Sequence, residues 1–169
     1  MAKKCTYKLK FRRRREKRTD YAKRLALVKS GLPRLVIRRT NQYIISQVIR
    51  FDPKGDITLV HINSSRLKKL GWNFSCKNMP AAYLTGYLCG IEAKKKNIEK
   101  AILDAGRYAS TKVVFACLKG FLDAGVEVPH DAEVIPSEER IKGKHIQDFY
   151  KNNIMEAFEK IKSNIAGLK

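Results

Sequence analysis

LVIRRTNQYIISQVIRFDPKGDITLVHI, residues 35–62, is the stretch that decides the fold. Residues 35–39 and 43–51 are rich in β-branched and aromatic side chains, and the Thr-Asn-Gln between them suits a tight turn, so they predict a β-hairpin. Residues 52–56 contain Pro-Lys-Gly, a turn signal, and lead to a third strand at 57–62. We therefore predict a three-stranded antiparallel meander. Both faces of its second strand are partly apolar, so we expect both to be partly covered.

Downstream of the meander, helical and strand patterns alternate. Residues 80–96 and 113–124 predict helices, and residues 101–104 and 126–128 predict short strands. Two glycines within a helix are costly, so the small-residue stripe of residues 82–93 predicts close approach of another backbone, that of the sheet. The alternation predicts an α/β fold with a mixed sheet, made of the antiparallel meander plus parallel crossovers, and packing helices.

The two ends of the chain predict further helices. In residues 20–30, Thr19 is the expected N-cap, and Tyr21, Leu25 and Val28 form one apolar face that would pin the N-terminal segment to the domain. A C-terminal amphipathic helix is marked by Ile146, Phe149, Ile154, Phe158, Ile161 and Ile165. Its stripe must be buried against the domain or against another protein. The predicted parts are a basic arm at 1–18, an α/β domain at 19–135, and a basic connection with the C-terminal helix at 136–169.

The charge of the chain is unevenly placed. The net charge is +20; residues 1–51 hold 17 Lys or Arg against two acidic residues, whereas residues 52–169 hold 19 against 14. Four consecutive arginines, Arg12, Arg13, Arg14 and Arg15, cannot be buried in a compact core. We expect residues 1–18 to be disordered when free and to order on a polyanion. Nucleic acid is the first candidate, and a membrane is the weaker one because no apolar run is long enough to span it.

Two other regions carry smaller RNA-binding signals. Residues 63–79 read as a loop with Lys68, Lys69, Trp72 and Phe74, whose aromatic rings either stack on bases or pack beneath the loop; both possibilities stay open. Residues 140–145 form a second basic cluster. The four cysteines show no zinc-binding spacing, so we expect no metal and no cofactor. The N-terminus lacks the apolar core of a signal peptide, so we expect a cytoplasmic protein.

Several motifs resemble one known family. The matching segments are FRRRREKRTDYAKRLALVKSG from Phe11, PRLVIRRTNQYIISQVI, the pairs Gly55-Asp56 and Gly71-Trp72, NMPAAYLTGYL, AILDAG, LKGFLDAGVEVPH and PSEERIKGKHI, in order along nearly the whole chain. They resemble the archaeal form of ribosomal protein number eighteen of the large subunit, the 5S rRNA-binding family related to the eukaryotic large-subunit protein five. Asn97, where a glycine is expected, and residues 107–112 depart from the family pattern.

The resemblance implies a ribonuclease-H-like type of fold and a structural place in the central protuberance of the large subunit. The implied partners are 5S rRNA, large-subunit rRNA and neighbouring ribosomal proteins, including the other 5S-associated protein, with no membrane. Together with the charge pattern, it predicts RNA contacts from Tyr7, Lys8, Lys10, Phe11, Arg12, Arg13, Arg14, Arg15, Lys17, Arg18, Tyr21, Arg24, Arg38, Arg39, Lys68, Lys69, Trp72, Arg140, Lys142 and His145.

The rival function is a ribonuclease-H-like nuclease, in which carboxylates such as those of Asp104 and Asp123 would hold magnesium. Each of these carboxylates also fits a local structural role at the end of a strand or a helix. Arg38 and Arg39 on the first strand would oppose a cation site. We therefore expect a structural RNA-binding protein rather than an enzyme.

Overall fold

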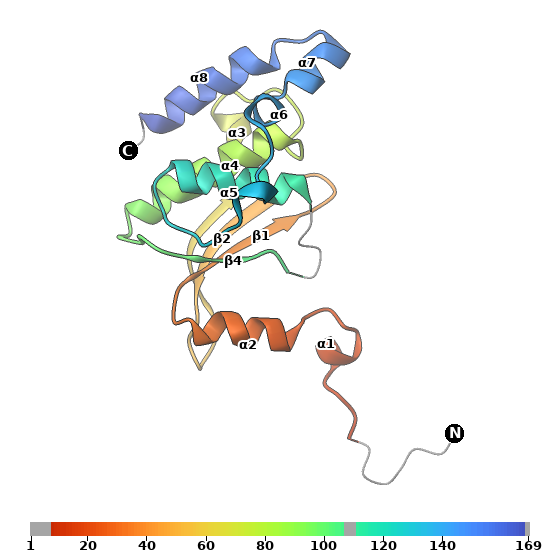
Figure 1. The fold of residues 1–169 in the computed structure, drawn as a ribbon, viewed down its shortest axis with the longest axis vertical. Helices are drawn as coiled ribbons and strands as arrows, with labels where there is room; N and C mark the ends of the chain where they lie inside the picture. Colours follow the sequence, from red (N-terminus) through yellow and green to blue (C-terminus); the bar gives the residue numbers. More distant parts are fainter. Residues whose placement is uncertain (1–7, 107–110, 168–169) are drawn as a thin grey trace, which may run out of the picture.

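A four-stranded sheet in the order β3-β2-β1-β4 forms the centre of the computed structural model, which describes residues 8–106 and 111–167 (Figure 1). The meander consists of β1 (Arg34–Arg39), β2 (Ile44–Arg50) and β3 (Ile57–Asn63), paired antiparallel in sequence order. The short strand β4 (Ile102–Asp104) pairs parallel with β1. The mixed-sheet α/β prediction is therefore confirmed.

The turn of the first hairpin is closed by one side chain. Thr40 Oγ1 accepts a hydrogen bond from the Tyr43 amide and donates to the Tyr43 carbonyl, both at 2.9 Å. This closure sets the register in which Arg39 pairs with Ile44 and Arg34 pairs with Ile49. Because side chains alternate across a strand, Arg34 and Arg38 then lie on one face of the sheet, and the buried Leu35 and Ile37 lie on the other.

Two helices, α4 (Met79–Lys94) and α5 (Lys112–Asp123), cover the face of the sheet that carries Leu35 and Ile37 (Figure 1). The small-residue stripe of α4 is in contact with α5, not with the sheet as predicted. A Cβ on Gly86 would lie 1.9 Å from the Cys117 carbonyl oxygen, and one on Gly120 would lie 2.1 Å from that of Tyr83. Glycine is needed on both helices because their backbones touch.

The C-terminal region is more broken than predicted. It forms α6 (Glu138–Lys142), α7 (Lys144–Tyr150) and α8 (Ile154–Ala166), and Lys151 ends α7 with a left-handed φ of 51°. Ile154, Phe158, Ile161 and Ile165 on α8 are all buried in the common core, and Ile146 on α7 is partly buried against it. The domain itself therefore covers these side chains, whereas Phe149 on α7 is 78% exposed.

Outside the main sheet and helices, the chain forms several short elements. The predicted strand at residues 126–128 is reduced to one parallel bridge between Lys100 and Glu127, bounded by Gly125 with a left-handed φ of 95° and by Pro129, which has no N–H to donate. Within the predicted loop and connection lie α3 (Arg66–Lys69) and the 3₁₀ turn η1 (Ala132–Val134). Asn97 has a φ of 57°, a conformation that asparagine tolerates better than most residues. No helix in the described ranges has the length and apolarity of a membrane span.

The N-terminal segment lies on the other side of the sheet from α4 and α5 (Figure 1). It forms α1 (Arg12–Arg15), a single turn, and α2 (Tyr21–Lys29). None of the residues of these two helices is buried. This face of the sheet is therefore only partly covered, in agreement with the prediction from the second strand.

Candidate nucleic-acid interface

The arginine run forms the single helical turn α1, in a segment that the sequence predicts to order only on a polyanion. The Arg15 amide donates to the Phe11 carbonyl at 2.9 Å. Arg18 Nε lies 2.9 Å from Glu16 Oε2, so one carboxylate reduces the repulsion within the run. Arg14 and Arg15 have no ion-pair partner in residues 8–106 and 111–167, and both are exposed. Planar guanidinium groups in this state are suited to bidentate phosphate binding.

Helix α2 begins one residue later than predicted. Its N-cap is Asp20, whose Oδ1 accepts from the Lys23 amide at 3.1 Å, and the Thr19 hydroxyl instead accepts two hydrogen bonds from Arg13 at 3.1 and 3.2 Å. Two of the three residues of the predicted apolar face are exposed, and only Val28 is partly buried. Tyr21 is 41% exposed and Leu25 is 57% exposed, because neither lies on the side of the helix that faces the sheet.

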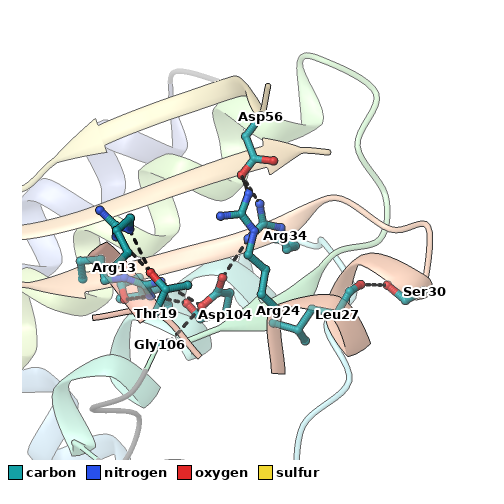
Figure 2. A network of polar contacts seen from close by, with 11 residues as sticks. Arg13, Thr19, Arg24, Leu27, Ser30, Arg34, Asp56, Asp104 and Gly106 are labelled. Carbon is teal, nitrogen blue, oxygen red and sulfur yellow. Dashed lines mark hydrogen bonds and ion pairs between the residues drawn. The ribbon is translucent and has the colours of Figure 1, made fainter. Parts of the chain in front are cut away.

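A connected set of ion pairs links α2 to the sheet (Figure 2). Arg24 Nη2 on α2 lies 2.8 Å from Asp56 Oδ2 in the loop before β3, and the same oxygen accepts from Arg34 Nη2. Arg34 Nη1 lies 3.0 Å from Asp104 Oδ2 on β4, and Arg38 Nη2 lies 2.9 Å from Asp104 Oδ1. The network therefore runs from α2 through two aspartates to the strand at the edge of the sheet.

Arg34 is the centre of this network and is only 4% exposed. A guanidinium cannot lose its charge in a protein, so its burial requires paired carboxylates, which Asp56 and Asp104 supply. Burial alone would raise the pKa of Asp104, but the hydrogen bond and charge of Arg38, the Gly106 amide and the charge of Arg34 outweigh burial and hold that pKa below its usual range. Asp104 is thus ionised at neutral pH.

Between α2 and the open face of the sheet lies a cavity of about 590 Å³. Cationic side chains dominate its lining, and its floor includes the apolar Val36 and Ile49. The charged lining residues are Arg13, Arg18, Lys23, Arg24, Arg34, Arg38 and Arg39, against Asp20, Asp56 and Asp104. Five of the residues predicted to contact RNA (Arg13, Arg18, Arg24, Arg38 and Arg39) are therefore brought together at one place, from segments distant in sequence.

The predicted RNA contact through Trp72 is not supported by the structure. The indole is 1% exposed, and its Nε1 donates to the Ser75 carbonyl at 3.1 Å. Its ring lies edge-on to that of Phe74, with 5.3 Å between the ring centroids. Of the two possibilities left open by the sequence, packing beneath the loop is the one observed. Lys68 and Lys69 on α3 remain exposed and available.

The second basic cluster lies on α6 and α7, at the far end of the molecule from the arm (Figure 1). Arg140 and His145 are exposed, whereas Lys142 lies 3.4 Å from Glu159 on α8. Partial burial and then the charge of Arg140 lower the pKa of His145, although Asp148 opposes this shift. At neutral pH a smaller fraction of His145 side chains is therefore protonated than of an ordinary histidine, so His145 adds little positive charge to this cluster.

The nuclease alternative finds no support in the arrangement of its carboxylates. Asp104 is bound by two arginines, and Asp123 accepts from the Tyr83 hydroxyl at 2.7 Å and lies 2.9 Å from Lys119 Nζ. The two aspartates line different cavities. In the part of the chain that the structure describes, no group of three or more His, Cys, Asp or Glu side chains could hold a metal ion.

Sequence reasoning missed Arg34 and Asp56 as parts of this site. The usable signal for Arg34 was the period of two in β1, which places it on the same face as Arg38. The signal for Asp56 was weaker, because a turn explains an aspartate equally well. Tyr7 lies outside the described residues, as does most of the segment 107–112.

Comparisons with known proteins agree with the motifs. Residues 5–99 match the model of the family described as ribosomal large subunit proteins 60S L5 and 50S L18. The large ribosomal subunit protein uL18 of Korarchaeum cryptofilum is 56% identical over 151 residues, which cover 88% of this chain and 77% of that protein. That of Caldivirga maquilingensis is 51% identical over 152 residues, which cover 88% and 73%.

Proposed function

The chain belongs to the family of ribosomal large subunit proteins 60S L5 and 50S L18, and from this we propose that it is a structural constituent of the large ribosomal subunit that binds 5S rRNA. It would help to attach 5S rRNA to the large rRNA in the central protuberance of the cytoplasmic ribosome. Its partners would be both RNAs and neighbouring ribosomal proteins, including the other 5S-associated protein.

The observation that carries the proposal is the concentration of cations around one open face of the sheet. The exposed run Arg12–Arg15 leads directly to the cavity beneath α2, where seven cationic side chains face three carboxylates. Phosphate neutralisation by such a surface supplies most of the affinity of an RNA-binding protein. The shape of the cavity and the fixed positions of its arginines would supply selectivity for one RNA fold.

The other predicted contacts would act from separate regions. Lys8, Lys10, Phe11 and Lys17 extend the arm, and Phe11 is exposed enough to stack on a base. Lys68 and Lys69 on α3, with Arg140, Lys142 and His145 on α6 and α7, would meet RNA away from the arm. The division into an arm at 1–18, a domain at 19–135 and a C-terminal part at 136–169 is proposed on the same basis.

We also propose that the fold is of the ribonuclease-H-like type. The sheet order β3-β2-β1-β4 combines an antiparallel meander with a parallel addition beside β1, and the parallel bridge at Glu127 continues it beyond β4. A fold of this type does not imply catalysis, since function depends on the residues placed on it. Here Asp104 is neutralised by arginines, which favours a structural role.

The test is a titration of a 5S rRNA transcript with the purified protein at 100 and 300 mM KCl, reported as a dissociation constant at each salt concentration. With roughly ten phosphate contacts, the affinity should fall by about a thousandfold or more over this range. Deleting residues 1–18 should leave the circular dichroism spectrum of the domain in place and weaken binding at least ~10-fold, since it removes most of the phosphate contacts.

A paired variant sharpens the test. Arg14→Gln with Arg15→Gln should reduce the slope of log affinity against log salt by about 1.4–1.8, the amount for two phosphate contacts. Lys94→Gln with Lys95→Gln removes the same charge from the end of α4 and is the matched control. An affinity that does not respond to salt, or an arm variant that behaves like the α4 control, would refute the proposed role.

A further inference from the structure

Helix α2 is attached to the domain with little apolar burial. None of its nine residues is buried: Tyr21 and Leu25 are exposed, and Leu27, which lines the cavity, and Val28 are only partly buried. The cavity of about 590 Å³ separates much of the helix from the sheet beneath it. Hydrophobic packing therefore contributes little to fixing the direction of α2, because that contribution scales with the apolar area removed from water.

The ion pair between Arg24 and Asp56 is the contact that spans this gap. Arg24 Nη2 lies 2.8 Å from Asp56 Oδ2, and both side chains are partly shielded from solvent. Water and salt screen a fully exposed ion pair so strongly that it contributes little to the free energy of folding. Partial shielding from solvent reduces this screening, so the pair contributes more. Among the described residues, this is the ion pair that joins α2 to another element.

Asp56 is itself held in place from below. Its Oδ2 also accepts from the buried Arg34, which Asp104 binds on its other side at 3.0 Å (Figure 2). A carboxylate fixed by a buried guanidinium has few alternative orientations, so the point at which α2 is tethered is rigid. The position of Arg24, and of the arm that precedes it, is therefore determined by the sheet.

We propose that Asp56 is a positioning residue for RNA binding: its carboxylate tethers Arg24 and so sets the direction in which α2 and the arginine run leave the sheet. The inference rests on the proposed function and deepens it. An arm held in its binding direction before the encounter loses less conformational freedom when RNA binds. A negative charge inside a cationic surface thus strengthens the binding of a polyanion.

The sign of one substitution separates this proposal from simple electrostatics. Asp56→Asn removes a negative charge, which by charge alone should tighten RNA binding. If Asp56 positions the arm, the same change weakens binding, by roughly fivefold to tenfold for the loss of one partly shielded ion pair. Glu127→Gln removes a negative charge from an exposed pair elsewhere and is the matched control, with no weakening expected.

The experiment is a double-mutant cycle on 5S rRNA affinity with wild type, Asp56→Asn, Arg24→Gln and the double variant. We expect each single variant to bind roughly fivefold to tenfold more weakly, and the double variant to bind no more weakly than the poorer single variant. Arg24→Gln keeps the pair between Arg34 and Asp56, so the hydrogen exchange of α2 in this variant tests the tether even if Asp56→Asn unfolds, independently of any direct contact of Arg24 with RNA. Lys29→Gln is its control on the same helix. Unchanged or tighter binding by Asp56→Asn in a folded protein, or strictly additive losses, would overturn the proposal.

A second measurement needs no RNA. Amide hydrogen exchange of Tyr21–Lys29 should accelerate in Asp56→Asn and Arg24→Gln, whereas exchange in Met79–Lys94 should not change in Arg24→Gln. Unaltered exchange in α2 would overturn the positioning role, whatever the affinities show. Failure of wild type to bind 5S rRNA would instead refute the proposed function, and the exchange result would still decide whether the tether exists.

Discussion

Arg34 on β1 donates from Nη1 to Oδ2 of Asp104 on β4 at 3.0 Å, across the parallel pair of strands, and both side chains are almost fully buried. The contact joins residues 70 positions apart in the chain. It places a permanent positive charge beneath the cationic cavity and neutralises the carboxylate that a nuclease would need. The stability of the domain and the charge of its open face therefore depend on the same pair.

Asp104→Asn should destabilise the domain by about 2 kcal/mol or more, because it leaves the buried guanidinium of Arg34 with one carboxylate fewer. Urea unfolding followed by circular dichroism measures the change. Lys100→Gln breaks the exposed pair with Glu127 and should cost less than about 0.5 kcal/mol. Equal stability of wild type and Asp104→Asn would show that the buried pair contributes nothing.

The same carboxylate predicts how stability depends on pH. The pKa of Asp104 is held below its ordinary value in the folded state, so the unfolded chain takes up the proton at a higher pH than the folded protein does. Its contribution is complete above about pH 5 and is lost as the pH falls through about 4 and below. The free energy of unfolding of wild type should therefore fall towards that of Asp104→Asn on acidification. Parallel curves from pH 6 to 2.5 would contradict this.

Gly86→Ala and Gly120→Ala should each destabilise the protein by about 2 kcal/mol, although alanine favours helix by about 1 kcal/mol over glycine. The added Cβ would meet a backbone carbonyl of the facing helix at 1.9 or 2.1 Å, and backbone cannot rotate away as a flexible side chain can. Thermal unfolding measures the change. Gly167→Ala is the control, since its Cβ would meet its nearest neighbour at 3.5 Å; if all three substitutions stabilise, the close packing of α4 and α5 is wrong.

Trp72→Phe should lower stability by about 2 kcal/mol and leave 5S rRNA affinity within about twofold of wild type, because the indole is packed in the core and donates to Ser75. Lys69→Gln should show the opposite pattern, with unchanged stability and weaker binding, because its side chain is exposed on α3. Chemical unfolding and filter binding of both variants test the pair. Weaker RNA binding by a folded Trp72→Phe would restore the indole as a contact.

Most elements of the fold could be predicted from local patterns. The meander, α4 and α5 follow from periods of two and of about 3.6 and from turn residues that act within a few positions. The patterns failed where chain length or context decided the result. Residues 126–128 have strand composition but form a single bridge, and the C-terminal helix breaks at Lys151, where no glycine or proline marks an end.

The sequence by itself determined that Arg12–Arg15 must stay out of the core, and it predicted that the N-terminal third binds a polyanion, since charge density needs no coordinates to be evaluated. Only the tertiary structure decided which charges act together. It buried Trp72, turned Tyr21 and Leu25 outward, and brought Arg24, Arg34 and Asp56 into one network from three separate segments. The physical reason is that an ion pair forms between groups a few ångströms apart in space, and only the folded chain sets that distance.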